Sequence, residues 1–304
     1  MHIVRYAEND TRRVRVGTLQ DGNVTPLRDV AGFSDLLARR LVDIRALVAD
    51  AGADGSRPVG DVLLLPPVDG LTEVWASGVT YERSMDARVE ESTSQDIYTR
   101  VYGADRPELF FKAPAWRVVT DGEPIAVRDD CAVTVPEPEL ALVITAHGEI
   151  LGYTVCNDVS SRDIEGENPL YIPQAKTYAG SCALAPTVRP AWEVAQASAL
   201  AIRVHVTRDG ETVFEGTTGT DRMHRSLTDL VAYLVRALEF PAGVVLATGT
   251  GIVPELGFSL RPGDRVEIVI DEIGSLSNPV GTLGESMGWP VAAIDNAFAR
   301  LEAR

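Results

Sequence analysis

Alternating apolar and polar residues predict several short strands near the start of the chain. Two such runs occur at 2–7 and 13–19, and the Asp21-Gly22 pair that follows is typical of a tight turn into a further strand at Val24. A short apolar run at 62–65 predicts one more strand. These strands flank a single helical segment.

The helical segment spans 34–49. Ser34 is suited to the N-cap position, and the apolar residues after it recur at intervals of three and four. A loop rich in Gly, Asp and Pro is expected over 51–60. We therefore place a domain boundary near residue 70, which separates a small N-terminal α+β domain over 1–70 from a larger catalytic domain over 71–304.

Strands dominate the larger domain. The segment 201–218 alternates in polarity on both sides of Asp209-Gly210 and predicts a hairpin, and 264–270 alternates again. Apolar residues with helical spacing predict one strong helix over 224–239. Successive strands with few helices between them favour an α+β class with mostly antiparallel strands over an alternating βαβ fold.

Composition and charge restrict the kind of partner. The chain has 304 residues, of which 45% are hydrophobic and 24% charged, as in a typical globular protein. Lys and Arg number 28 and Asp and Glu 44, so the formal net charge is −16. Nucleic acids and anionic membranes both require a basic surface, so we expect neither as a partner. An anionic substrate has to be attracted by a local positive site.

Several features predict a cytoplasmic location. The sequence contains no run of about 18 apolar residues and no signal-peptide core at its start. Cys131, Cys156 and Cys182 are the only cysteines, and three widely spaced cysteines do not suggest a disulfide framework. The four histidines lack the spacing of a zinc site. We expect reduced thiols and a cytoplasmic protein.

Two glutamates mark the start of a predicted strand. Residues 136–139 read Pro-Glu-Pro-Glu, and from 139 onward the apolar residues Leu140, Leu142 and Ile144 share one face. Because side chains alternate along a strand, Glu137 and Glu139 lie together on the opposite face, about 6.6 Å apart at the backbone. The prolines remove backbone donors, so this end is not an ordinary central strand.

A hairpin adds a third carboxylate to this pair. A turn near His147 followed by a strand over 150–156 pairs residue 139 with about 155 and residue 137 with about 157, which brings Asp158 beside Glu137. Three adjacent carboxylates repel one another unless a cation offsets their charge. Oxygen ligands favour Mg²⁺ or Mn²⁺ over Zn²⁺. The alternative is that the two glutamates are solvated charges beside a turn.

Four ordered motifs resemble those of the fumarylacetoacetate hydrolase family. They are Pro-Glu-Pro-Glu-Leu at 136–140, Gly-Tyr-Thr-Val-Cys-Asn-Asp-Val-Ser-Ser-Arg-Asp at 152–163, Gln-Ala-Lys at 174–176 and Ala-Thr-Gly-Thr-Gly at 247–251. The resemblance covers about residues 72–285. It implies a mixed-β catalytic domain and an assembly of two or four copies, so we expect a homodimer or homotetramer.

The resemblance also implies roles for individual residues. Glu137, Glu139 and Asp158 correspond to the Mg²⁺ ligands, Lys176 to a residue near the substrate, and Thr250 to the loop over the substrate carboxylate. Hydrolases of this family carry a His that activates the attacking water. In the matching stretch 78–84 of this chain, Ser84 stands at the place of that His. Loss of such a base costs about 10²–10⁴-fold in rate. The acidic partner of that His is not assigned; the candidates are Asp86, Glu90 and Glu91.

One branch of the family accounts better for these residues. Thr-Tyr-Glu-Arg-Ser at 80–84 and Ser-Ser-Arg-Asp-Ile-Glu-Gly-Glu-Asn-Pro-Leu-Tyr at 160–171 resemble the 2-keto-3-deoxy sugar acid dehydratases of the arabinonate and xylonate type. The resemblance implies conversion of a 2-keto-3-deoxypentonate into 2,5-dioxopentanoate through a metal-stabilised enolate. Loss of a C3 proton and the C4 hydroxyl does not need the His.

Two lysines stand out because all other basic residues besides His are arginines. Lys176 and Lys112 are the only lysines among the 28 Lys and Arg residues. A cation and an arginine near Lys176 are expected to lower its pKa, which makes it a candidate general base or enolate partner. Lys112 is a second candidate for the substrate site, or a core residue whose amine reaches the surface.

The remaining site candidates are less specific. Glu108, Ser84 and Glu167 are candidates for protonating the leaving hydroxyl, and the sequence does not choose among them. Arg83 and Arg162 are candidates for binding the substrate carboxylate, because a guanidinium binds a carboxylate with two hydrogen bonds. The turn that contains Thr250 offers backbone N–H groups to the same carboxylate, or is a plain loop.

Three functions remain in competition. The first is a Mg²⁺-dependent hydro-lyase that acts on a small 2-oxo acid, a 2-keto-3-deoxy sugar acid. The second is a hydrolase that cleaves a C–C bond of acylpyruvates or fumarylacetoacetate, with another residue as base. The third is a protein that binds metal and a 2-oxo acid without turnover. Product identification distinguishes them.

Overall fold

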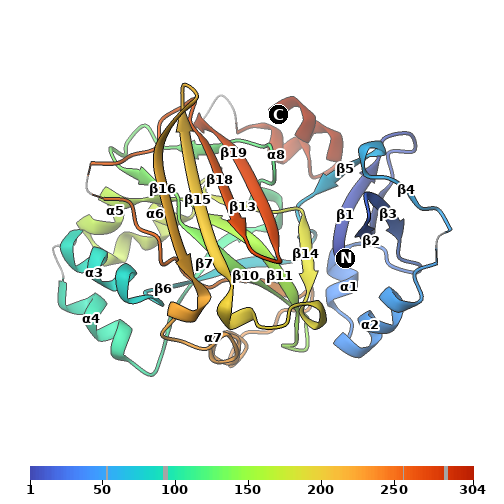
Figure 1. Cartoon of the computed structure of the whole chain (residues 1–304), viewed down its shortest axis with the longest axis horizontal. Coiled ribbons are helices and arrows are strands. Elements are labelled where there is room, and N and C mark those ends of the chain that lie inside the picture. Colours follow the sequence, from blue (N-terminus) through green and yellow to red (C-terminus); the bar gives the residue numbers. More distant parts are fainter. Residues whose placement is uncertain (53, 92–94, 256, 284–286) are drawn as a thin grey trace.

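The computed structural model describes the chain except residues 53, 92–94, 256 and 284–286, and it does not describe the side chains within 90–96. Two sheets form the centre of the molecule (Figure 1). In spatial order the larger sheet contains β4 (Arg57–Pro58), β3 (Asn23–Pro26), β2 (Val14–Gln20), β1 (His2–Glu8), β14 (Thr187–Pro190), β11 (Ile150–Asp158), β10 (Pro138–Ile144), β17 (Val244–Ala247), β6 (Glu73–Gly78) and β7 (Glu108–Pro114), while β5 (Val62–Leu65) pairs with β1 and β13 (Cys182–Leu184) with β11.

The second sheet has five strands and packs against the first. Its order is β16 (Glu211–Gly219), β15 (Ala201–Arg208), β18 (Arg265–Ile270), β19 (Gly274–Thr282) and β8 (Ile125–Val127), and a separate pair joins β9 (Thr134–Val135) to β12 (Ser160–Ser161). Most neighbouring strands are antiparallel; the named exceptions are β17 with β6 and β19 with β8. The α+β class predicted from the sequence is confirmed.

Helices surround this pair of sheets. The α-helices are α1 (Phe33–Leu37), α2 (Leu41–Ala49), α3 (Glu82–Glu91), α4 (Gln95–Gly103), α5 (Arg162–Glu167), α6 (Ile172–Lys176), α7 (Leu227–Leu234) and α8 (Trp289–Ala292). In Figure 1, α1 and α2 lie beside β1 and β2, whereas α3 and α4 lie at the opposite side of the molecule. No helix in the described part of the chain has the length and apolarity that a membrane span requires.

The two faces of β10 contribute to two different cores. Leu140, Leu142 and Ile144 pack with the five-stranded sheet, as the alternation predicts. Ala141 and Val143 face the other way, into a second core that contains Phe33 and other residues of α1. The β10 strand is therefore buried on both faces, and its position is strongly constrained.

The prediction of one continuous helix over 34–49 is wrong, because the structure has two helices there, α1 and α2. The turn at 145–149 supplies the competing contacts: Ala146 N–H donates to the Leu37 carbonyl at the end of α1 (2.8 Å), and the Glu149 carboxylate accepts from Leu41 N–H at the start of α2 (2.7 Å). The N-terminus of α1 is capped by the remote Asp69, which accepts from Phe33 N–H, rather than by Ser34.

The predicted helix over 224–239 is confirmed but shorter. Its first turn begins after Ser226, whose hydroxyl accepts from Asp229 N–H (3.1 Å), because His224 N–H is already bonded to the Thr80 carbonyl. Beyond Leu234 the chain turns. The hairpins at 14–26 and 201–219 and the strands at 62–65 and 265–270 are confirmed. The domain boundary near residue 70 stays a prediction.

Candidate active site

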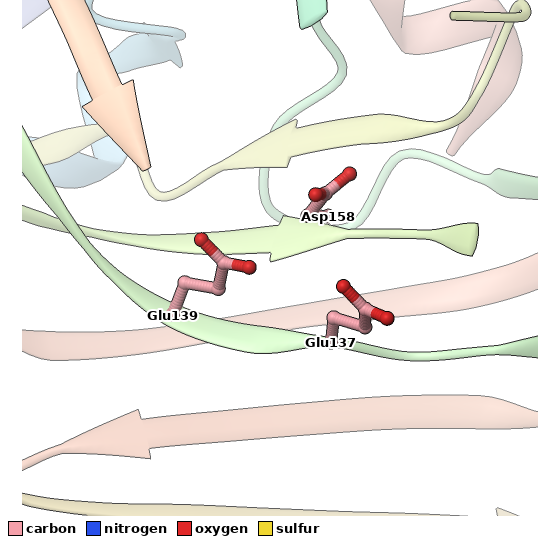
Figure 2. Close-up of side chains that lie close together, drawn as sticks. All are labelled: Glu137, Glu139 and Asp158. Atoms are coloured by element: carbon pink, nitrogen blue, oxygen red, sulfur yellow. The ribbon is translucent and has the colours of Figure 1, made fainter. Parts of the chain in front are cut away.

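Three carboxylates meet at one end of the β10–β11 hairpin (Figure 2). Glu137, Glu139 and Asp158 each offer an oxygen, and these oxygens all lie within 4.8 Å of one another. All three residues are at most 2% exposed. Buried carboxylates at this separation repel one another, and a set of oxygen-only ligands is what Mg²⁺ and Mn²⁺ prefer. The three residues therefore fit a divalent cation.

The strand register creates this arrangement. Glu139 lies opposite Cys156 and Pro138 opposite Asn157, and Asp158 N–H donates to the Glu137 carbonyl (3.0 Å). The sequence predicted that the same three carboxylates converge, but it paired residue 139 with residue 155, one position before the observed partner Cys156. The difference has a cause in the structure: a bulge between Val143 and Ile144 shifts the register by one residue.

Basic side chains surround Glu137. Lys176 Nζ donates to Oε2 (2.6 Å), and the guanidinium groups of Arg88 and Arg162 donate to Oε1 (3.0 and 3.1 Å). Burial alone would raise the pKa of Glu137, but the charges of Lys176, Arg88 and Arg162 outweigh burial and hold this pKa well below its usual range. Glu137 is therefore ionised.

Glu139 has a different environment. Its carboxylate accepts a hydrogen bond from Gly249 N–H (2.7 Å), and no basic side chain in the described part of the chain forms an ion pair with it. Burial and the neighbouring charges of Asp158 and Glu137 raise its pKa well above the ordinary value. Glu139 is thus the carboxylate whose ionisation most needs an added cation.

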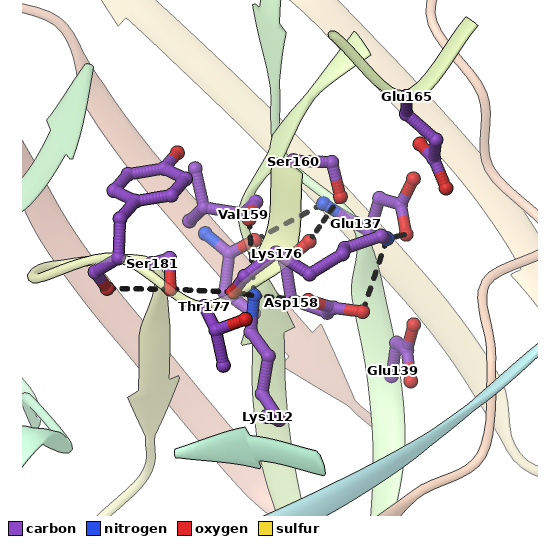
Figure 3. A network of polar contacts seen from close by, with 12 residues as sticks. Lys112, Glu137, Glu139, Asp158, Val159, Ser160, Glu165, Lys176, Thr177 and Ser181 are labelled. Atoms are coloured by element: carbon purple, nitrogen blue, oxygen red, sulfur yellow. Dashed lines mark hydrogen bonds and ion pairs between the residues drawn. The ribbon is translucent and has the colours of Figure 1, made fainter. Parts of the chain in front are cut away.

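The two lysines of the chain both contact Asp158 (Figure 3). Lys176 Nζ donates to Oδ2 (3.1 Å), and Lys112 forms an ion pair with Oδ1. Lys112 is completely buried, and its ammonium group also donates to the Val159 carbonyl (3.1 Å) and to the Lys176 carbonyl. Lys112 therefore links the backbone at Lys176 to a candidate metal ligand.

The expected direction of the Lys176 pKa shift is corrected by this geometry. Burial lowers the pKa of Lys176, but the carboxylates of Asp158 and Glu137 lie within hydrogen-bonding distance and raise it above its ordinary value. Lys176 is therefore an ammonium group in this arrangement. Phe110 lies beside it, with the ring centre 5.7 Å from Nζ.

A narrow cavity opens on the three carboxylates. Lys176, Ser84, Glu108 and Thr250, all predicted from the sequence, line it. Its free volume is only about 10 Å³, close to the space of one water molecule. Desolvation in the cavity raises the pKa of Glu108, while the charges of Arg88 and Lys176 oppose the shift.

Two glycines allow backbone and side chains to approach closely. A Cβ atom at Gly78 would lie on the Glu108 carboxylate, so a larger residue at 78 would displace that carboxylate. Gly249 has φ of +93° and its added Cβ would overlap Thr80 Oγ1. Both glycines therefore help to place the acidic side chains of the cavity.

Other predicted candidates do not line this cavity. Arg83 is exposed and lines a neighbouring groove, and Glu167 is exposed at the end of α5. Arg162 and Lys112 lie beside the cavity and contact Glu137 and Asp158. Asp86 is exposed, and the side chains of Glu90 and Glu91 lie outside the described part of the chain. No histidine among the described residues lines the cavity.

Sequence reasoning missed several residues of the cavity wall, among them the polar residues Arg88, Tyr98 and Glu165. A signal for two of them was present. Arg88 follows Ser84 by four residues and Glu165 follows Arg162 by three, so each pair shares one face of its helix. The contacts of Arg88 could not be predicted from the sequence, because its partner Glu137 lies 49 positions away.

Comparison with known families and proteins agrees with this geometry. The family described as "Fumarylacetoacetate (FAA) hydrolase C-terminal" matches residues 73–281. A Haloferax volcanii protein named "Probable 2-keto-3-deoxyxylonate dehydratase" is 46% identical over 263 residues, which are 86% of this chain and 88% of that protein. The 2-dehydro-3-deoxy-D-arabinonate dehydratase of Saccharolobus solfataricus is 45% identical over 226 residues, 73% of this chain and 76% of that protein.

A solved structure extends the similarity to three dimensions. The 2-keto-3-deoxy-D-arabinonate dehydratase complexed with magnesium and 2,5-dioxopentanoate is 36% identical and superposes with a TM-score of 0.78, over 93% of this chain and 99% of that one.

Proposed function

The chain belongs to the fumarylacetoacetate hydrolase family, and we propose that within this family it is a Mg²⁺-dependent dehydratase of a 2-keto-3-deoxy sugar acid. The substrate is a 2-keto-3-deoxypentonate and the product is 2,5-dioxopentanoate. One observation carries the proposal: the three carboxylates open on a cavity that holds Lys176, Glu108 and Ser84, and no described histidine lines it. A hydrolase of this family would need that base.

Glu137, Glu139 and Asp158 would hold the divalent cation. When bound, Mg²⁺ or Mn²⁺ stabilises negative charge on the keto oxygen of a 2-oxo acid and offsets the charge of the carboxylates that keep Lys176 protonated. Gly249 N–H orients Glu139 by its hydrogen bond, and Lys112 orients Asp158 by its ion pair.

The overall reaction requires several proton movements. The C4 hydroxyl leaves as water and C5 becomes an aldehyde. Protons leave C3, C5 and the C5 hydroxyl, and protons return to C3, C4 and the departing hydroxide, so the balance is zero and no oxidant is needed. At least one group in the cavity must therefore both accept and donate protons.

Lys176 is the group proposed to move the proton at C3. Its Nζ atom lies on the cavity wall between Glu137 and Asp158, at 2.6 and 3.1 Å from their oxygens. These contacts hold the amine in one orientation. Because Glu137 and Asp158 keep Lys176 protonated, it would have to lose its own proton, with the charge of those carboxylates offset, before its amine could accept the C3 proton and later return one.

Glu108 is the group proposed to protonate the leaving hydroxyl. Of the three candidates for this role, Glu108 and Ser84 line the cavity and Glu167 does not. The raised pKa of Glu108, caused by desolvation, favours the protonated form that an acid catalyst needs. Ser84 is the residue proposed to hydrogen-bond the departing hydroxyl; in support, it lines the cavity and is only 4% exposed.

We also propose a cytoplasmic homodimer or homotetramer. Support for reduced thiols is that all three cysteines are free. Support for assembly is a set of exposed apolar side chains beside α8: Trp116 and Ile294 line one groove, and they are 39% and 60% exposed. Light scattering during gel filtration gives the number of copies.

Product analysis tests the proposed function. The protein is incubated with Mg²⁺ and either a 2-keto-3-deoxypentonate or an acylpyruvate, and the products are identified by NMR. We expect 2,5-dioxopentanoate from the sugar acid, loss of this product after treatment with a chelator, and its recovery with Mg²⁺ or Mn²⁺. Full activity in a metal-free preparation, or no loss of water from any 2-keto-3-deoxy acid, contradicts the proposal.

A further inference from the structure

The proposed mechanism leaves one ion pair of the cavity wall without a role. Arg88 of α3 and Glu165 of α5 form an ion pair, and both side chains line the cavity. Arg88 is 8% exposed and Glu165 is 2% exposed. Among the arginines in the described part of the chain, Arg88 alone lines this cavity, although Arg83 and Arg162 were the candidates from the sequence.

The contacts give the cavity two different ends. At one end Gly249 N–H is bonded to Glu139, and Thr250 lies beside it. At the other end Arg88 bridges Glu137 (3.0 Å) and Glu165. In Figure 3, Glu137 lies between Glu139 and Glu165, in agreement with this order.

A linear 2-keto-3-deoxy acid has two ends of different chemistry. Its carboxylate and keto oxygens are the atoms that chelate a divalent cation, so they belong at the carboxylates Glu137, Glu139 and Asp158. Its other end carries hydroxyl groups. A hydroxyl both donates and accepts a hydrogen bond, and Glu165 can only accept while Arg88 can only donate. Arg88 can therefore donate a hydrogen bond to a substrate hydroxyl, and Glu165 can accept one from the same hydroxyl.

Resting on the proposed function, we propose that Arg88 and Glu165 bind the terminal C5 hydroxyl of the substrate and select acids that carry it. The C4 hydroxyl is assigned to Glu108 and Ser84, which leaves the C5 hydroxyl for the pair. A hydrogen bond between a hydroxyl and a charged group contributes about 10- to 100-fold in affinity. In the free enzyme the two residues form an ion pair with each other.

Binding of two non-reacting acids tests this inference. Neither 2-oxopentanoate nor 5-hydroxy-2-oxopentanoate has a C4 hydroxyl, so neither can lose water, and they differ only at C5. Their dissociation constants are measured by calorimetry at saturating Mg²⁺ for the wild type, for Glu165→Ala, and for Glu211→Gln, an exposed control on β16. We expect the wild type and the control to prefer the 5-hydroxy acid by at least about 10-fold.

The variant separates recognition from a structural role. In Glu165→Ala the preference is expected to fall below about 3-fold, through weaker binding of the 5-hydroxy acid alone. No preference in the wild type, or equal weakening of both acids in the variant, overturns the inference. If Glu165→Ala does not fold, Glu165→Gln decides: its neutral oxygen is a weaker acceptor, so an unchanged preference overturns the inference as well.

Failure of this inference differs from failure of the proposed function. If neither acid binds and no 2-keto-3-deoxypentonate is dehydrated, the proposed function is wrong. If both acids bind and dehydration occurs without a preference at C5, only the role of Arg88 and Glu165 is wrong.

Discussion

The charges at the site are distributed unevenly over the three carboxylates. Glu137 accepts hydrogen bonds from three basic side chains, whereas Glu139 accepts one from a backbone N–H. A divalent cation would therefore stabilise Glu139 most, since Glu137 is already compensated. The basic residues also supply the local positive site that an anionic substrate of a chain with net charge −16 requires.

Replacement of Lys176 tests proton transfer at the residue scale. We expect Lys176→Met to lower kcat by about 10²-fold or more, because the group proposed to move the C3 proton is lost. Affinity for Mn²⁺ should not weaken, since a positive charge beside two metal ligands is removed. Lys176→Arg should keep the ion pairs but stay inactive, because a guanidinium does not release its proton. Near-normal kcat in either variant removes Lys176 from the mechanism.

Glu108 makes a prediction about pH. Desolvation raises the pKa of Glu108, so its acid form persists above the ordinary range of glutamate and is lost as the pH rises through the raised pKa. Activity that depends on this acid should fall on the alkaline side. Glu108→Gln should lower kcat by about 10²–10⁴-fold and abolish that alkaline fall. A variant with the same pH profile as the wild type rules out Glu108 as the acid.

The sequence predicted many of the residues that line the cavity, but not their environment. The carboxylates, Lys176 and Ser84 belong to recognisable motifs. The pKa of Lys176 was expected to be lowered, because the sequence does not show that both Glu137 and Asp158 lie within hydrogen-bonding distance. Arg88 escaped notice because its partners are contributed by other elements.

At the scale of elements, tertiary contacts determine the register of the hairpin and the break in the helix over 34–49, which local patterns do not predict. The strand register of the hairpin was one residue off because the bulge at Val143 has no signal in the alternation of apolar residues. The helix over 34–49 was expected to be continuous because its periodicity is continuous. The bonds from the 145–149 turn that interrupt it come from residues about one hundred positions away.

The role of Gly249 can be tested by comparing its substitution with the same substitution at Gly263. Gly249 and Gly263 both have φ of +93°, but an added Cβ overlaps Thr80 at Gly249 and meets nothing at Gly263. Alanine at either site costs about 1–2 kcal/mol for the backbone conformation. We expect Gly249→Ala to lose about a further 1–3 kcal/mol in the free energy of unfolding and to bind Mn²⁺ more weakly, because Gly249 N–H orients Glu139. Equal stability and equal Mn²⁺ affinity in the two variants would show that Gly249 has no special role.

At the scale of the whole molecule, the two predicted domains share a core. Phe33, Leu36 and Leu37 of α1 belong to the same apolar cluster as Val143 and Val245 of the central strands. Strand β1 also pairs with β14, which joins the two parts in one sheet. The N-terminal part therefore covers a face of the sheet that holds Glu139.

This shared core predicts the behaviour of a fragment. Residues 71–304 alone would expose Val143, Val245 and their neighbours, and each large apolar side chain left in water costs about 1.5–3 kcal/mol. We expect the fragment to be insoluble or to unfold without a cooperative transition, as followed by circular dichroism. A soluble fragment with a Tm near that of the full chain contradicts this expectation.

The central claim is that the wild-type enzyme eliminates water rather than hydrolysing a C–C bond. Its most direct test is the ratio of kcat/KM for a 2-keto-3-deoxypentonate to kcat/KM for an acylpyruvate, both measured with Mg²⁺ under one set of conditions. Ser84 cannot activate water without a base of its own, so we predict a ratio of at least about 10² in favour of the sugar acid. If the acylpyruvate is turned over faster than every 2-keto-3-deoxy acid tried, the dehydratase account is wrong and the enzyme is a hydrolase.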